Sequence, residues 1–196
     1  MLGSIVSFIG HVVDAAGSVV GYRRGTEEPD HSVEKLTAGV EIRHYGARLA
    51  AQTVVTADEE AARNTGFRRL ARYIFGANRS EAKIAMTAPV AQEAAGEDKW
   101  VIRFFMPSNK TLETLPEPVD AEVNLVSVPA QTIAVRRFSG SRSRRAVSEQ
   151  TSKLLNTLRE TGFEVIDRPE AWFYDPPWTV PMLRRNEIAV PVKPNP

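Results

Sequence analysis

The residues that could do chemistry in this chain are few and widely spaced. Cysteine is absent, which excludes disulfides, thiolate metal sites, iron–sulfur clusters and a cysteine nucleophile. The histidines His11, His31 and His44 lie in three different parts of the chain, so a multi-histidine metal site is not expected. Carboxylates such as Asp175 and Glu187 could form an acid–base pair, but nothing in their spacing singles them out. A glycine-rich phosphate loop, a nucleophile elbow and a zinc-protease motif are also absent, so no motif supports an enzyme.

Two segments have an unusual local sequence. In the first, Tyr73–Arg79 is followed by Lys83–Val90, which joins the end of a predicted helix to a predicted strand. In the second, the proline-rich stretch Tyr174–Pro181 leads into Leu183–Glu187. A stiff proline-rich loop with Trp178 at its tip can form one wall of a pocket for a flat apolar ligand. Alternatively, the prolines fix a crossover between strands and Trp178 fills the core, and composition alone favours this second interpretation.

The elements that must position these segments follow from hydrophobic periodicity. Residues 40–45 alternate strictly, so Val40, Ile42 and His44 are predicted to share the inward face of a strand. Asp58 is a suitable N-cap for a helix that runs to about Phe75, and its apolar stripe has the spacing i, i+3, i+4, i+7. The stripe consists of Phe67, Leu70, Ala71 and Ile74.

The second half of the domain repeats the element order of the first. Besides the first strand and helix, the first half contains predicted strands over 48–56, 83–90 and 99–106, with a turn over 93–98. The second half contains predicted strands over 123–128 and 131–138, a helix over 143–160, and strands over 163–166, 171–174 and 187–192. We therefore predict an α+β fold in which a duplicated unit with pseudo-two-fold symmetry builds one barrel-like core, with one helix from each half outside it.

Length and composition fit one globular domain preceded by a different N-terminal segment. Of the 196 residues, 42% are apolar and 25% charged, and the formal charge of +1 argues against a dedicated nucleic-acid binder. Residues 1–21 are apolar but lack the positive start of a signal peptide, and Asp14 near their centre would be costly inside a bilayer. We divide the chain into residues 1–35, an apolar segment plus a polar linker over 25–34, and a domain over 36–196.

The N-terminal segment is predicted to be a tail that covers an apolar groove. Peripheral membrane contact through residues 1–21 is the alternative. Because cysteine is absent and no signal peptide is recognised, we expect a cytoplasmic protein, either a monomer or a weak oligomer, with possible membrane association.

Over residues 40–192 the chain resembles the SOUL haem-binding protein family. The resemblance is carried by Val40–Gly46, by Lys83–Val90, and by Tyr174–Pro177 together with Arg184–Glu187. It implies a distorted antiparallel β-barrel with two flanking helices, a fold shared with the effector-binding domains of some transcription regulators. It also implies non-covalent binding of haem or related porphyrins by a carrier, buffer or delivery protein.

The resemblance further implies that the haem pocket lies between the first helix and the loop after Tyr174–Pro177. The implied lining consists of Phe67, Leu70, Ala71 and Ile74 on the helix, and of Trp178, Thr179, Val180, Met182 and Leu183 on the loop. Family members place basic residues near the haem propionates, and Arg72 matches one such position. Asn64 and the loop residues Thr179 or Val180 occupy two others without charge, so Arg68, Arg69 or Arg184 would have to substitute.

His44 stands at the strand position where a histidine has been proposed as the axial iron ligand in the family. Other members have a different residue there, so the ligand role is not a requirement of the family. The alternative is a core histidine hydrogen-bonded to the backbone, with haem held by apolar contacts alone. Two further functions stay open: an enzyme that acts on a bound tetrapyrrole, and a sensor or interaction domain that binds other amphipathic ligands.

Overall fold

The computed structural model describes residues 26–195, so the predicted tail over 1–21 lies outside the described residues. The described part contains ten strands, two α-helices and one short 3-10 helix. In chain order these are β1 (His31–Lys35), β2 (Val40–Tyr45), β3 (Arg48–Thr56), α2 (Glu59–Ile74), β4 (Val90–Gly96), β5 (Lys99–Phe105), β6 (Asn124–Val128), β7 (Gln131–Phe138), α3 (Arg144–Arg159), β8 (Phe163–Val165), β9 (Glu170–Phe173), η1 (Pro181–Leu183) and β10 (Asn186–Pro194).

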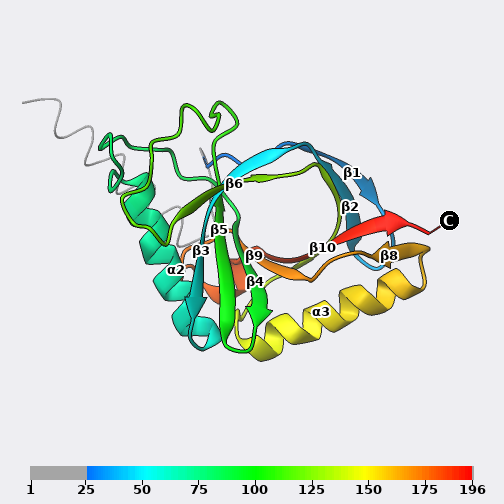
Figure 1. Cartoon of the computed structure of the whole chain (residues 1–196). Coiled ribbons are helices and arrows are strands. Elements are labelled where there is room, and N and C mark those ends of the chain that lie inside the picture. Colours follow the sequence, from blue (N-terminus) through cyan, green and yellow to red (C-terminus); the bar gives the residue numbers. More distant parts are fainter. Residues whose placement is uncertain (1–25, 196) are drawn as a thin grey trace, which may run out of the picture.

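The strands form one antiparallel sheet whose order is close to symmetric. The order is β1-β2-β7-β10-β9-β4-β5-β3-β6, with β8 paired to the end of β10. About the central β9–β4 pair, β10 corresponds to β5, β7 to β3, and β2 to β6. Figure 1 shows the sheet curled into a distorted barrel with α2 and α3 outside it. The predicted α+β barrel with two flanking helices and pseudo-two-fold symmetry is therefore confirmed.

The core is divided by the curled sheet into three apolar clusters. Successive strand residues point to opposite faces, so Phe105 packs inside the barrel while its neighbour Phe104 packs under α2. The clusters are anchored by Tyr45, Phe105 and Trp172 inside the barrel, by Leu70, Ile74 and Phe104 beneath α2, and by Leu154, Leu158 and Ile188 beneath α3. Both helices are thus fixed to the outer face by their apolar stripes.

Helix α2 begins and packs as its sequence predicts. The Asp58 side chain accepts hydrogen bonds from the backbone N–H groups of Glu60 and Ala61, which caps the helix. Gly66 then faces the side chain of Ile102 on β5 so closely that an added Cβ would clash with it. The absence of a side chain at Gly66 therefore sets how near α2 lies to the sheet, and with it the position of Phe67 one residue later.

Two sequence predictions on the elements are wrong. The linker predicted over 25–34 contains the start of β1, which pairs along its whole length with β2. The strand predicted over 83–90 is not a ladder strand, because β4 begins only at Val90 and continues through the predicted turn to Gly96. β1 and the second half of β4 are strands because their backbones pair with a neighbouring strand. Their side chains are mostly exposed or polar, so their sequences show no alternation of apolar residues from which a strand could be predicted.

The two α-helices of the described part differ from membrane spans. Neither α2 nor α3 combines the length and the continuous apolar character that crossing a bilayer needs.

Candidate ligand-binding site

The site lies where α2 faces the segment that follows β9. A pocket of about 340 Å³ opens there, with α2 on one side, the residues just before β4 at its base, and the proline-rich segment on the other side. It is lined by Thr26, Arg63, Asn64, Phe67, Met86, Thr87, Ala88, Val90, Arg142, Phe173, Tyr174, Asp175, Pro176, Pro177 and Trp178. This is the size and mixed chemistry of a small-molecule site: mostly apolar walls with a few polar groups.

Two arginines from different helical regions meet at the pocket. The guanidinium of Arg63 lies 5.2 Å from the centre of the Phe173 ring, and that of Arg142 lies 5.5 Å from the same ring. Their polar contacts are neutral: Arg63 donates to the Gln92 side chain and to the carbonyl of Arg142, and Arg142 donates to the carbonyl of Asp175. Within residues 26–195, neither arginine forms an ion pair with a carboxylate.

The electrostatics of this pair favour an anion. Burial, followed by the positive charges of Arg184 and Arg63, lowers the pKa of the Arg142 guanidinium to about 10. Burial also lowers the pKa of Arg63, against the opposing effect of Glu59 and Glu60. Both shifts mean that the folded protein disfavours the positive charges as they stand, and a bound carboxylate would relieve that cost.

The proline-rich wall of the pocket is anchored by the residues that lead into β10. The hydroxyl of Tyr174 donates to Oε2 of Glu187 over 2.7 Å, and Oδ2 of Asp175 accepts from the backbone N–H of Arg185 over 2.7 Å. Arg184 donates to the carbonyls of Thr179 and Pro177. The Tyr174–Pro177 and Arg184–Glu187 motifs, separated in the sequence, therefore form one hydrogen-bonded unit.

The centre of this unit is the buried carboxylate of Glu187. It accepts two hydrogen bonds from Arg43, at 2.7 and 3.0 Å, and one from Arg185 at 2.9 Å. Burial alone would raise its pKa, but the hydrogen bonds and charge of Arg43, together with Arg185 and Tyr174, outweigh burial and hold the pKa of Glu187 below its ordinary value. Arg185 also pairs with Glu28, which ties the chain just after Thr26 to the same unit.

The structure distributes the predicted pocket residues over three environments. Phe67 and Trp178 line the pocket together. Leu70, Ile74 and Thr179 are completely or almost completely buried, and Ala71 packs against the α2 core. Arg72, Val180, Met182 and Leu183 are exposed and do not line the pocket. Haem contact by each of these residues stays a prediction.

The expectation that His44 points inward is wrong. Its side chain is 43% exposed, and it contacts the Thr132 hydroxyl at 3.1 Å and Glu34 Oε1 at 3.4 Å. Alternation does place it on the face of Val40 and Ile42, but the α3 cluster that covers those residues does not include His44. The alternative of a core histidine bonded to the backbone is not observed either, and the ligand role of His44 stays a prediction.

Sequence reasoning missed the two pocket arginines. Arg142 belongs to a cluster of arginines over residues 136–145, and such a cluster predicts a solvent-exposed surface. Arg63 lies outside the apolar stripe of its helix. Of the substitutes considered for propionate binding, Arg69 pairs with Asp120 and Glu122, and Arg184 holds the loop. The signal that could have pointed to the site was the Lys83–Val90 motif, whose last residues form the base of the pocket.

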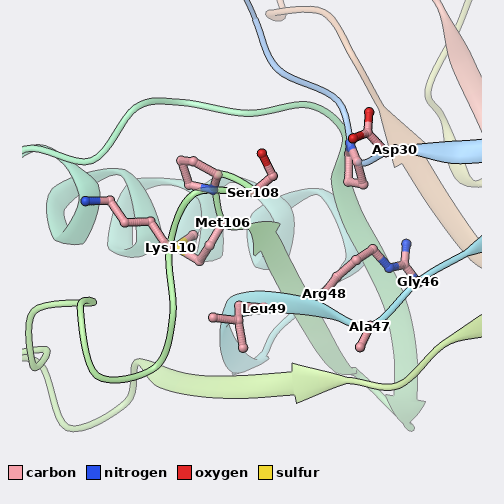
Figure 2. Close-up of a pocket in the computed structure, with 10 residues that line it drawn as sticks. Asp30, Gly46, Ala47, Arg48, Leu49, Met106, Ser108 and Lys110 are labelled. Atoms are coloured by element: carbon pink, nitrogen blue, oxygen red, sulfur yellow. The ribbon is translucent and has the colours of Figure 1, made fainter.

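A second pocket, of about 250 Å³, lies between the turn after β2 and the chain after β5 (Figure 2). Its cations do not converge, because Lys110 and Arg48 do not point toward each other in the close-up. The Arg48 guanidinium instead stacks on Tyr45 and Phe105 inside the barrel. Nor does any group of three or more histidine and carboxylate side chains in residues 26–195 come together to hold a metal.

These features define a class of protein, an α+β ligand-binding domain. Its curled sheet and one helix form a pocket with mostly apolar walls and two arginines. The fold is shared with the C-terminal domain of EcmrR, with a TM-score of 0.62 over 81% of this chain and 99% of that domain, at 11% sequence identity. At this identity the likeness concerns the fold alone.

Sequence comparison identifies the family. The SOUL heme-binding protein model matches residues 26–191. The chain is 35% identical over 158 residues to heme-binding protein 2 of Homo sapiens, covering 76% of this chain and 75% of that protein. It is 34% identical over 166 residues to the same protein of Mus musculus, covering 80% and 79%. The chain belongs to the SOUL heme-binding protein family, as the resemblance in its motifs predicted.

Proposed function

We propose that this protein binds haem, or a related tetrapyrrole, non-covalently in the pocket between α2 and the Tyr174–Trp178 segment, and so carries, buffers or delivers it. The observation that carries the proposal is the pair Arg63 and Arg142 at the edge of an apolar pocket: both cations are partly buried, and neither pairs with a carboxylate of residues 26–195. A porphyrin combines a flat apolar ring with carboxylates on one edge, which is the chemistry that this arrangement matches.

The way in which haem would be held follows from the lining. Phe67, Met86, Phe173 and Trp178 offer apolar contact to the ring, while the arginines pair with the propionates. Among residues 26–195 the pocket lining includes no histidine, so we expect ring contact and propionate pairing to supply the affinity. With a volume of about 340 Å³ the pocket encloses only part of a porphyrin, and the half-exposed Trp178 can cover more of the ring.

The experiment is a titration with hemin that follows the Soret band. We expect saturable one-to-one binding. Iron-free protoporphyrin IX should bind within a few-fold of hemin, because the lining contributed by residues 26–195 offers no imidazole. Hemin dimethyl ester, which lacks the carboxylates, should bind about tenfold more weakly. Loss of absorbance during turnover would instead support an enzyme, and no binding at all would support a domain for other amphipathic ligands.

Two double variants assign the propionate contact. Replacing Arg63 and Arg142 by glutamine should weaken hemin about tenfold and abolish its advantage over the dimethyl ester. The matched control replaces Arg68 and Arg72, exposed arginines of the same helix outside the pocket lining, by glutamine. If the control pair weakens hemin and the pocket pair does not, Arg72 holds the propionate, as the family pattern implies, and the assignment to Arg63 and Arg142 is wrong.

A further inference from the structure

Four large apolar side chains are concentrated in the short loop that follows the pocket wall. They are Trp178, Val180, Met182 and Leu183, with exposed fractions of 64%, 38%, 76% and 46%. Pro177 and Pro181 restrict the backbone of the loop. The Arg184 guanidinium donates hydrogen bonds to its Pro177 and Thr179 carbonyls. Exposed apolar side chains concentrated in one loop are costly in water and mark a candidate interaction surface.

Cations lie near this loop on the side that leads into α3. The backbone N–H of Gly140 donates to the carbonyl of Pro181 over 2.9 Å, which places the segment just before α3 beside the loop. Arg144 and Arg145 are exposed in the first turn of α3, and that turn contains no acidic residue. The positive end of the helix dipole lies at the N-terminus and favours acidic residues, so these two arginines do not stabilise the helix. Arg142 and Arg184 add to the same positive surface. The acidic groups near it are Glu59 and Glu60 on α2, the buried Asp175, and Glu149 on α3.

The loop also borders the mouth of the pocket. Trp178 lines the pocket and is exposed at the same time, whereas Met182 and Leu183 are exposed and outside the lining. Arg142 lines the same pocket. The apolar loop and the nearby arginines therefore lie next to the pocket.

We propose that this region docks on the surface of an anionic lipid bilayer, with the 178–183 loop in the headgroup region and the arginines paired with lipid phosphates and carboxylates. Apolar side chains that enter the interface and cations that pair with anionic headgroups are the two contributions that bind proteins to such surfaces. The pocket mouth then faces the bilayer. That an amphipathic porphyrin enters the pocket from the membrane rests on the proposed function; the docking itself does not.

The small extent of the apolar surface favours a bilayer over a protein partner. A stable protein interface buries roughly 800 Å² on each partner and is usually complementary over that whole area. Four apolar side chains of one short loop are far fewer than the roughly 20–30 residues that such an interface uses on each side, whereas insertion into headgroups needs only a few side chains.

The test is co-sedimentation of the full-length, ligand-free protein with phosphatidylcholine vesicles, with and without phosphatidylserine. We expect binding to the anionic vesicles that weakens at higher salt, because the electrostatic part is screened. Replacing Met182 and Leu183 by serine should reduce vesicle binding about tenfold or more. Replacing Arg144 and Arg145 by glutamine should reduce binding to anionic vesicles by about the same factor.

Matched controls use exposed residues on other parts of the surface. Val119→Ser with Ile166→Ser removes apolar side chains of 68% and 54% exposure, and Arg79→Gln with Arg159→Gln removes two exposed arginines. Both controls should bind vesicles like the parent. If the parent does not sediment with anionic vesicles, or if loop and control variants sediment alike, the proposal is wrong. It is also wrong if the loop variant converts a dimer to a monomer in light scattering while vesicle binding is unchanged.

The two proposals fail separately. The Arg144→Gln, Arg145→Gln variant should bind hemin in solution like the parent, because these two exposed arginines do not line the pocket. If the protein binds vesicles but not hemin, the docking proposal stands and the haem-binding proposal is wrong. If it binds hemin but not vesicles, the haem-binding proposal stands and the docking proposal is wrong.

Discussion

The hydroxyl of Tyr174, on the pocket wall, lies 2.7 Å from Oε2 of Glu187, a carboxylate with no exposure to solvent. The same carboxylate binds Arg43 on β2 and Arg185 at the start of the β10 region. Burying so much charge stabilises a fold only when all partners are present. We therefore expect the removal of any one partner to destabilise the protein and release the pocket wall from its position.

Glu187→Gln should destabilise the protein by about 3–5 kcal/mol, because it leaves the buried Arg43 without its counter-charge. The pH dependence has a definite sign. Since the folded-state pKa of Glu187 is lowered, its contribution is present above the unfolded value of about 4.3 and is lost as pH falls through the lower folded value. Urea unfolding at a series of pH values checks both.

The control is Glu164→Gln, which removes an ion pair on the surface. Glu164 pairs with Lys193 over 3.1 Å, and each of the two side chains is about half exposed. It should cost no more than about 1 kcal/mol. Equal costs for the two variants would mean that Glu187 does not organise the wall.

Trp178→Ala should weaken hemin about tenfold while the free energy of unfolding changes by less than about 1 kcal/mol. The reason is that Trp178 lines the pocket but keeps 64% of its surface exposed. Soret titration and urea unfolding of the same preparation measure the two effects. A variant that titrates like the parent would show that the loop is not a pocket wall.

Leu70→Ala and Phe67→Ala should separate the core from the site, although both residues belong to one predicted stripe. Leu70 is fully buried, so its truncation should cost about 2–5 kcal/mol and leave the hemin affinity of the folded protein nearly unchanged. Phe67 is 40% exposed in the pocket lining, so its truncation should cost less stability and more affinity. The opposite ranking of affinities would place haem deeper under α2.

His44→Ala should leave the Soret spectrum and hemin affinity unchanged, because His44 does not line the pocket. Its contacts with Thr132 and Glu34 are exposed, so stability should change by less than about 1 kcal/mol. Absorption spectra of the ferric complex before and after the substitution are sufficient. A shifted Soret band would assign the axial ligand to His44 and move the haem from the α2 pocket to the face of β2.

Local patterns in the sequence determined the elements that depend on side-chain periodicity and capping. The α2 stripe around Leu70, its Asp58 cap and the twofold repeat of the element order are all present in the structure, because each depends on residues close together in the chain. The family resemblance implied a pocket between the first helix and the loop after Tyr174–Pro177, and Phe67 and Trp178 from these two segments both line the pocket between α2 and the proline-rich segment. That haem binds there stays a prediction.

Only the tertiary structure decided which side chains of those walls reach the pocket and which cations serve it. The stripe continues from Phe67 into a core where Leu70 and Ile74 are buried in one apolar cluster with Ile102 and Phe104 of β5. Arg63 and Arg142 are 79 positions apart and meet only because α2 and the start of α3 approach Phe173 from two sides. Burial and charge proximity of that kind depend on contacts between distant segments, which the spacing of residues along the chain does not encode.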